Sequence, residues 1–314
     1  MIIAVTGATS FICQKLIARH LAMGDEVRYL TRSNSKPIKN ATAFIGDVNS
    51  PPDQLLPFLN NADIFYHCAA ELKNEAIMHR TNVQGTANLL KLALLGNVAR
   101  WVQLSSTGIY GDQPNTTVVE ETIPQPNNAY EVSKLAADFL VIDAVQNYGL
   151  DAVIIRPSNV YGQTMTNQSL FSLIRMIHQG LFFFIGKKGA IANYIHVDNL
   201  VDAMVLAAVS KHKQNASIYI VSAQCTMETF INLIANALAV KPPKLRLPAS
   251  LVRFIVAIAE CIKISPLTSA RIDALTRTTV YSAEKITKEL GYTHKMTIED
   301  GVTELVKFWS SRKQ

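Results

Sequence analysis

The chain has 314 residues, of which 49% are hydrophobic and 17% charged, so it can bury a sizeable core as one large domain or two closely associated ones. This composition indicates a globular protein, and no uncharged apolar stretch approaches the ~20 residues that cross a bilayer. The formal net charge is +6, and the segment from Lys241 to Arg277 holds seven basic and two acidic residues. These basic residues are not interleaved with stacking aromatics, so we predict an anionic small molecule or an acidic surface as partner and no nucleic acid.

The four cysteines, Cys13, Cys68, Cys225 and Cys261, are widely scattered along the chain. Their spacing predicts neither a metal-binding pair nor a dense disulfide framework. No pattern typical of a secretory signal precedes the first apolar run. We therefore expect a cytoplasmic protein with reduced thiols and no bound metal.

The first stretch, from Ile2 to Cys13, is an apolar run that breaks at Gly7 and continues as an amphipathic helix. It predicts the first strand, phosphate-binding turn and first helix of a dinucleotide-binding unit. Backbone N–H groups at a helix N-terminus stabilise a pyrophosphate when no side chain blocks its approach, and Gly7 provides that access. Ser10 and Cys13 replace the second and third glycines of the usual motif, so the stretch alone also fits a strand–turn–helix without a ligand.

Further strands are predicted over Val27–Thr31, up to Gly46-Asp47-Val48, over Asp63–His67 and over Trp101–Leu104, with a helical segment over Glu75–Leu95. Strands that alternate with helices predict an α/β fold with a parallel, doubly wound sheet, whose ligands bind beyond the carboxyl ends of the strands. The second strand ends in Thr31 and Arg32 where an acid would bind a ribose hydroxyl. An arginine there binds a 2′-phosphate, so we predict a preference for NADP(H), with NAD(H) as the alternative.

The most informative chemical pattern is Tyr130-x-x-x-Lys134. Asn128 is predicted to cap this helix and Glu131 to complete the capping box, which puts Tyr130 in the first turn and Lys134 one turn later on the same face. A nearby ammonium and the positive end of a helix both favour phenolate over a phenol with an ordinary pKa of about 10. Ser106 follows the fifth strand and is placed to hydrogen-bond the same substrate oxygen. Standing alone, such a pair on an exposed helix face carries no chemistry.

Several spaced motifs occur together in one order: the Gly7 turn, Asp47-Val48, Cys68-Ala69-Ala70, Asn82 with Gly85-Thr86, the run from Ser105 to Gly111, Tyr130 with Lys134, the run from Arg156 to Gly162, and the run from Tyr194 to Asn199. This set resembles the extended short-chain dehydrogenase/reductase family, also called the NAD-dependent epimerase/dehydratase family. The resemblance implies a Rossmann sheet with a smaller C-terminal substrate domain. We expect residues 1–163 plus 194–225 to bind the dinucleotide and residues 164–193 plus 226–314 to bind substrate.

The resemblance also implies a role for individual residues. Tyr130 would be the general acid/base, Lys134 would lower its pKa and hold the nicotinamide ribose, and Ser106 would bind the reacting oxygen during hydride transfer. The implied cofactor-binding residues are Gly7, Ser10, Phe11, Ile12, Arg32, Asp47, Val48, Cys68, Ala69, Ala70, Tyr130, Lys134 and Pro157. The implied substrate-binding residues are Ser106, Thr107, Asn159 and Arg271. Asn82 is expected to tie the backbone and not to touch a ligand.

Three functions are compatible with these residues. The basic excess in the substrate half suits a nucleotide-sugar, so the first hypothesis is a 4-epimerase or 4-keto reductase. Dehydration is disfavoured, because Thr107 follows Ser106 where family dehydratases begin an acidic pair. Asn193, where nucleotide-sugar enzymes often carry arginine, and the phenylalanine run at 182–184 favour an NADPH-dependent reductase of an apolar ketone, similar to hydroxysteroid and dihydroflavonol reductases. A non-catalytic redox sensor would fit the altered glycine turn but leaves the catalytic residues unexplained.

Two segments are candidates for protein or membrane contacts. In this family, helices equivalent to Glu75–Leu95 and Tyr130–Tyr148 pack as a four-helix interface, and both carry more apolar residues than one sheet-facing stripe needs. We therefore expect a homodimer. The segment Leu251–Ile264 is too short and too charged to span a bilayer, which leaves a buried helix, a dimer contact or an interfacial helix.

Overall fold

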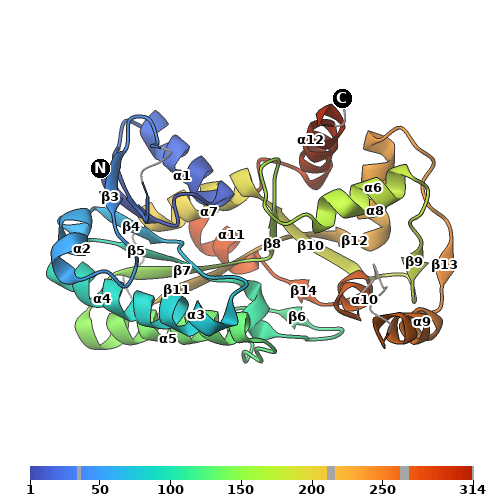
Figure 1. Cartoon of the computed structure of the whole chain (residues 1–314), viewed down its shortest axis with the longest axis horizontal. Helices are drawn as coiled ribbons and strands as arrows, with labels where there is room; N and C mark the ends of the chain where they lie inside the picture. The colour runs from blue at the N-terminus through green and yellow to red at the C-terminus, as the bar shows by residue number, and fades with distance from the viewer. Residues whose placement is uncertain (34–36, 211–215, 262–268, 313–314) are drawn as a thin grey trace.

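The computed structural model describes residues 1–33, 37–210, 216–261 and 269–312, and the side chains within these ranges except those of residues 257–261 and 269–271. The molecule is elongated, with one large sheet at its N-terminal end and several smaller sheets and helices at the other (Figure 1). Among the described helices, none has both the length and the apolar character needed to span a bilayer.

The large sheet has seven strands: β1 (Ile2–Thr6), β2 (Glu26–Thr31), β3 (Thr42–Ile45), β4 (Ile64–His67), β5 (Trp101–Leu104), β7 (Ala152–Pro157) and β11 (Ser217–Val221). Their order is β11-β7-β5-β4-β1-β2-β3, and every pairing is parallel. The strand order reverses between β1 and β4, which is where a doubly wound sheet opens a crevice for its ligand. The predicted fold class is confirmed.

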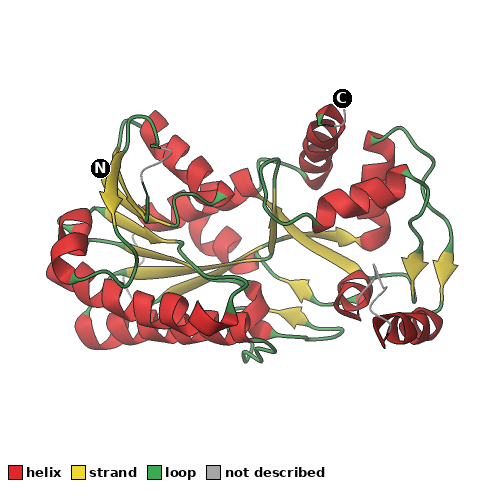
Figure 2. Cartoon of the chain, viewed as in Figure 1, coloured by secondary structure: helices red, strands yellow, loops and turns green. Residues whose placement is uncertain are grey.

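Helices cover both faces of this sheet (Figure 2). One face packs on α1 (Phe11–Ala22), α7 (Val197–Val209) and α11 (Glu284–Leu290), and the other on α2 (Pro52–Leu59), α4 (Gly85–Leu95) and α5 (Ala129–Tyr148). The alternation of side chains along each strand divides the core in two. In β1, Ile3 and Val5 join the first cluster and Ala4 the second.

The helix predicted over Glu75–Leu95 is present but interrupted. It consists of α3 (Glu75–His79), a π-helical turn over Arg80–Gln84, and α4. At the end of this turn Gly85 packs so closely that a Cβ atom there would lie 2.4 Å from Cγ2 of Val48. The wide turn therefore brings the helix against the segment that follows β3, a contact that helical periodicity alone does not predict.

The remaining elements form smaller units at the other end. The sheets are β12 (Ala223–Thr226) with β10 (Ile191–His196) and β8 (Asn159–Tyr161), β13 (Arg246–Leu247) with β9 (Phe184–Ile185), and β14 (Val280–Tyr281) with β6 (Thr117–Val118). The helices are α6 (Ser169–His178), α8 (Met227–Ala237), α9 (Ala249–Cys261), α10 (Ser269–Thr276) and α12 (Ile298–Ser311).

This arrangement differs from the predicted division of the chain at two places. β10 and β12 overlap the range 194–225 but pair in a separate sheet, not in the large one. Conversely, Ile286 of α11 and the nearby Tyr292 belong to the core beneath the large sheet, although residues 226–314 were expected to lie in the substrate domain. Because α11 packs against β11, this C-terminal part of the chain lies against the large sheet.

Candidate active site

A cavity of about 800 Å³ lies at the carboxyl ends of β1 to β4, beside the reversal of strand order. Its walls are the segments that follow these four strands, together with Arg80 and Thr81 of the π-helical turn. The predicted cofactor residues that line it are Gly7, Ser10, Arg32, Asp47, Val48, Cys68, Ala69 and Ala70. The structure therefore brings together residues that are far apart in the sequence.

At Gly7, which lines this cavity, the turn after β1 lies against the backbone that follows β4. Its φ is +74°, and a Cβ atom there would lie 2.9 Å from both Ala69 N and Cys68 C, so no side chain fits. Ser10 then begins α1: its N–H donates to Gly7 O (2.9 Å), and its Oγ accepts from Cys13 N (3.2 Å). The first turn of α1 contains no acidic residue, so the positive end of the helix faces the cavity unopposed.

A buried hydrogen-bond chain holds the ends of β1 and β4 in place. Thr6 Oγ1 accepts from Cys68 N (3.1 Å) and contacts His67 Nδ1 (2.8 Å), while His67 Nε2 contacts Thr86 Oγ1 (2.9 Å). Thr86 Oγ1 itself donates to Asn82 O (2.6 Å), so His67 Nε2 is the donor to Thr86 and His67 Nδ1 the acceptor from Thr6. Burial lowers the pKa of His67 to about 3, which keeps this ring neutral.

Cys13 occupies the place of the third glycine without disrupting the fold. Its side chain is fully buried, and its Sγ donates to Thr6 O over 3.6 Å. The thiol is therefore absorbed into the core between α1 and β1.

Five of the predicted cofactor residues do not line the cavity: Phe11, Ile12, Tyr130, Lys134 and Pro157. Phe11 packs at the edge of the core that contains Tyr161, and Ile12 packs on the core beneath the large sheet. Pro157 is buried at the end of β7, paired with Val221. Phe11 and Ile12 lie in the first turn of α1, where backbone N–H groups have no partner within the helix. We therefore expect them to contribute backbone N–H groups and not side chains to the cavity.

Tyr130 lies in the first turn of α5. Asn128 Oδ1 accepts from Glu131 N (3.0 Å), as predicted, whereas Glu131 Oε2 accepts from Asn127 N (2.7 Å), one residue before the expected partner. Burial raises the pKa of Tyr130 to about 12, against an opposing hydrogen bond with Ser106. Ser106 therefore faces the phenol, and the catalytic role of the pair stays a prediction.

Lys134 lies one turn after Tyr130 and is almost fully buried. Its Nζ donates to Leu104 O at 2.5 Å, at the end of β5. Burial lowers the pKa of Lys134, and the charge of Asp138 opposes this. Burial is the largest influence on the pKa of Tyr130, and the Lys134 ammonium is directed to a backbone carbonyl. The expectation that Lys134 lowers the pKa of Tyr130 stays a prediction.

A buried polar cluster around Asp138, which lies one helical turn after Lys134, was not predicted from the sequence. Asp138 Oδ2 accepts from Ser105 Oγ (2.8 Å) and from Arg156 Nε (3.1 Å), and Arg156 Nη1 donates to Tyr110 Oη (2.7 Å). The signal available in the sequence was spacing: Asp138 follows Lys134 by four residues on the same helix face. Its partners lie on β7 and after β5, and only the folded chain brings them there.

The predicted substrate residues are more dispersed. Thr107 is buried, and its hydroxyl faces the Tyr281 phenol. Asn159 is exposed on β8, and its Nδ2 donates to Asn193 O (3.4 Å). Arg271 lies in α10, but its side chain is outside the described residues.

Two asparagines have backbone roles. Asn82 Oδ1 accepts from Glu71 N (2.7 Å) and Asn82 Nδ2 donates to Glu71 O (2.9 Å), so Asn82 ties the backbone as expected. Asn193 Nδ2 donates to Thr279 O (2.8 Å) and is buried. Neither side chain is therefore free to hold a ligand.

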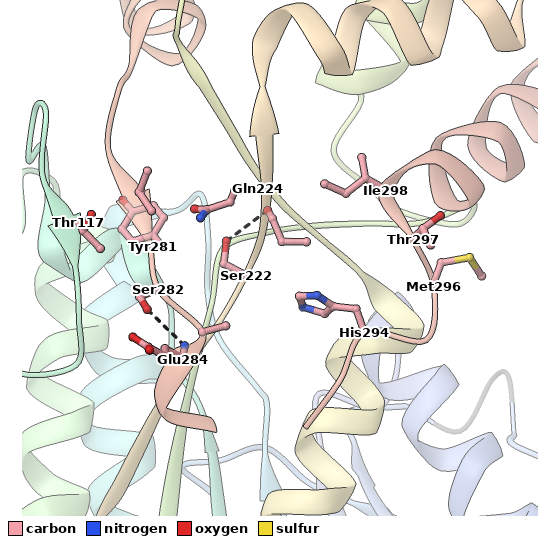
Figure 3. A pocket seen from close by; sticks show the side chains of 13 residues that line it. Thr117, Ser222, Gln224, Tyr281, Ser282, Glu284, His294, Met296, Thr297 and Ile298 are labelled. Carbon is pink, nitrogen blue, oxygen red and sulfur yellow. Dashed lines mark hydrogen bonds between the residues drawn. The ribbon is translucent and has the colours of Figure 1, made fainter. Parts of the chain in front are cut away.

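A second hollow of about 630 Å³ lies apart from the predicted site residues (Figure 3). Its lining comes from the start of β12, from β14 with the residues after it, and from the segment that leads into α12. Tyr281 lines this hollow and also faces Thr107, the residue that follows Ser106. Tyr281 therefore separates the hollow from Thr107. Gln224 and His294 approach the hollow from different segments.

Comparison with known proteins decides the family. Residues 3–222 match the model of the NAD dependent epimerase/dehydratase family. The chain belongs to this family. It is 26% identical to the 4-hydroxy-2-methyl-3-oxo-4-farnesyl-3,4-dihydroquinoline-1-oxide ketoreductase of Stigmatella aurantiaca, covering 96% of this chain and 94% of the relative. It is 25% identical to the UDP-glucose 4-epimerase of Vibrio cholerae, covering 95% and 92%. The crystal structure of UDP-glucuronic acid 4-epimerase from Bacillus cereus in complex with NAD shares the fold, with a TM-score of 0.78 at 18% identity over the whole of both chains.

As a member of the epimerase/dehydratase family, the protein is an NAD(P)-dependent enzyme. The described residues fit such a cofactor: the Gly7 turn leaves no room for a Cβ atom beside the cavity, and the N-terminus of α1 opens there. Ser106, Tyr130 and Lys134 follow β5 and begin α5, next to this cavity in the same sheet edge. The candidate acid/base residues and the candidate cofactor cavity thus lie at adjoining strand ends.

Proposed function

We propose that this enzyme is an NADPH-dependent reductase of an apolar ketone. The observation that carries the proposal is where the basic residues of the substrate half lie. Arg246 pairs with Glu228 (2.5 Å) and covers the Phe184 ring at 4.7 Å, and Arg253 pairs with Asp273 (2.6 Å). These two arginines are already compensated within the protein, which weakens the support for a diphosphate group on the substrate.

The catalytic residues provide acid/base chemistry for such a reduction. When bound, the dinucleotide supplies a hydride to the carbonyl carbon. Ser106 donates a hydrogen bond to the carbonyl oxygen, and Tyr130 donates its phenolic proton to that same oxygen as negative charge develops there. Because burial raises the pKa of Tyr130 to about 12, the phenol holds its proton at neutral pH and is ready to act as the acid.

A nucleotide-sugar 4-epimerase is the second candidate, and one side chain favours it. The Nε of Arg277 is buried and has no hydrogen-bond partner among the described residues, although it lies 3.8 Å from Asp112 Oδ1, within ion-pair distance. This guanidinium faces the Tyr281 phenol, which also faces Thr107. A cation beside the residue that follows Ser106 would suit an anionic substrate, in agreement with the Vibrio cholerae relative.

Turnover with defined substrates distinguishes the two functions. We expect NADPH oxidation with apolar cyclic ketones such as ketosteroids, followed by absorbance, and no interconversion of UDP-glucose and UDP-galactose. Epimerisation of the UDP-sugar without net NADPH consumption, together with no turnover of any apolar ketone, would replace the first proposal by the second.

Arg32 is expected to give a preference for NADP(H) of roughly tenfold or more. It lines the cofactor cavity at the end of β2, where its side chain is exposed. A charge-assisted hydrogen bond to a phosphate contributes about 1.5–3 kcal/mol before desolvation and screening, and about 1.4 kcal/mol is a factor of ten. Titration of both dinucleotides into wild type and Arg32→Ala measures this. Equal affinities in wild type, or unchanged selectivity in the variant, would contradict the assignment.

We also propose a homodimer through α3, α4 and α5. Val132 and Phe139 are exposed seven residues apart on α5, and Ile77 and Leu95 are exposed on the neighbouring helices. Sedimentation at micromolar concentration should show a dimer for wild type and a monomer for Phe139→Asp. A wild-type monomer would refute the proposal.

The predicted cytoplasmic location stays a prediction.

A further inference from the structure

Over residues 249–256 helix α9 presents two apolar faces, and the described part of the chain covers one of them. Val252 and Val256 are buried in a small cluster with Ile185 and Ile272. On the remaining surface of the helix, Leu251, Phe254 and Ile255 are 47%, 66% and 53% exposed. Large apolar side chains gathered on one short helix are unusual at a water-facing surface and mark a contact site.

Two more exposed leucines lie in the segments that precede the strands beside this helix. Leu245 O accepts from Phe184 N (2.9 Å) just before β13, and Leu181 precedes β9 in the same paired unit. Both leucines are exposed. β9, β13 and α9 lie together at the end of the molecule farthest from α2 (Figure 1). We call residues 181–189 and 241–256 the distal end.

The distal end carries the whole charge excess of the protein. Its two segments contain six basic residues and no acidic residue, whereas the full chain has 30 basic and 24 acidic residues, so the rest of the chain is balanced. Two of the six are the ion-paired Arg246 and Arg253. Within the described part of the chain, no carboxylate lies within ion-pair distance of the other four: Lys187, Lys188, Lys241 and Lys244. All four lysines are exposed.

We propose that the distal end docks on a lipid bilayer that contains anionic headgroups. An amphipathic helix with exposed Leu, Phe and Ile inserts its apolar side chains into the interface, and lysines beside it are attracted to the anionic lipid. A second copy of this chain is a poorer occupant, because its own four lysines would meet those of the first. This docking surface goes beyond the proposed function, and it holds for either substrate class.

Vesicle co-sedimentation tests the proposal. Wild type should bind vesicles of phosphatidylcholine mixed with phosphatidylglycerol, bind vesicles of phosphatidylcholine alone much more weakly, and lose binding as salt is raised. Free phosphatidylglycerol headgroup, glycerol phosphate, should not compete, because the apolar contact is missing. Wild type that sediments no more with anionic vesicles than without vesicles would overturn the proposal.

Two matched pairs of variants locate the contact. Ile255→Asp should lower vesicle affinity roughly tenfold or more, whereas Ile123→Asp, at a position that is 75% exposed in a loop after β6, should not change it. The double charge reversal Lys187→Glu/Lys188→Glu should lower the affinity for anionic vesicles by a similar factor, and Lys39→Glu/Lys307→Glu should not.

Circular dichroism and dinucleotide affinity, which report on folding and on the distant cofactor cavity, should be unchanged in all four variants. Equal losses in the test and control variants would overturn the proposal. So would concentration-dependent self-association that Ile255→Asp abolishes in the absence of any vesicle binding. Loss of ketone turnover with vesicle binding intact would count against the proposed function alone.

Discussion

Tyr130→Phe is expected to lower kcat for reduction by roughly 10²–10⁴-fold while the dinucleotide binds as before. The substitution removes only the phenolic hydroxyl, which supplies the proton, and keeps the aromatic ring in the first turn of α5. Steady-state turnover and cofactor titration measure the two effects separately. Tyr148→Phe, at the exposed C-terminal end of the same helix, is the matched control and should retain full activity.

The pH dependence of the two reaction directions, reduction and alcohol oxidation, provides a second test of the role of Tyr130. Since burial raises the pKa of Tyr130 to about 12, the protonated form predominates over the neutral range, so reduction should change little with pH. Alcohol oxidation needs the deprotonated form, whose fraction grows as pH approaches that value from below, so its rate should rise with pH. More than about a tenth of wild-type activity in Tyr130→Phe would show that another group supplies the proton.

Asp138→Ala is expected to lower the free energy of unfolding by about 3–5 kcal/mol, because it leaves Arg156 buried without its carboxylate. Both side chains are almost completely inaccessible, so water cannot replace the lost partner. Urea denaturation measures the change. Asp138→Asn, which keeps an acceptor oxygen for Ser105 and Arg156, should lose less stability than the alanine variant.

The matched control for this position is Asp143→Ala on the same helix. Asp143 Oδ1 accepts from Asn147 Nδ2 (2.7 Å) at an exposed site, so its removal should change stability by only about 0.5 kcal/mol. If both alanine variants unfold at the same urea concentration, the buried cluster does not stabilise the fold as argued.

Local patterns in the sequence were sufficient for the elements that carry the chemistry. The Gly7 turn is predicted because a positive φ and a close backbone contact both require glycine, and the structure shows both. Tyr130 and Lys134 are predicted on one face because the helical period puts every fourth residue there. The alternation of strands with helices likewise predicts the parallel sheet and therefore the edge where ligands bind.

Other features depend on contacts between distant segments, which no local pattern specifies. The cluster of Asp138, Arg156 and Tyr110 joins α5, β7 and the segment after β5. The π-helical turn at 80–84 follows from the packing of Gly85 on Val48.

The electrostatics of the site also came from tertiary structure. A sequence reports which residues are charged, but a pKa depends on burial and on the neighbours that packing provides, so Tyr130 is raised where spacing alone suggested a lowered pKa. In the same way, the composition located a basic excess between Lys241 and Arg277, and the fold placed four of its seven basic residues on the distal end and paired two of them, both arginines. The sequence by itself therefore determined the fold class and the helix face that carries Tyr130 and Lys134, while three-dimensional packing decided how deeply these side chains are buried and where the charged side chains lie.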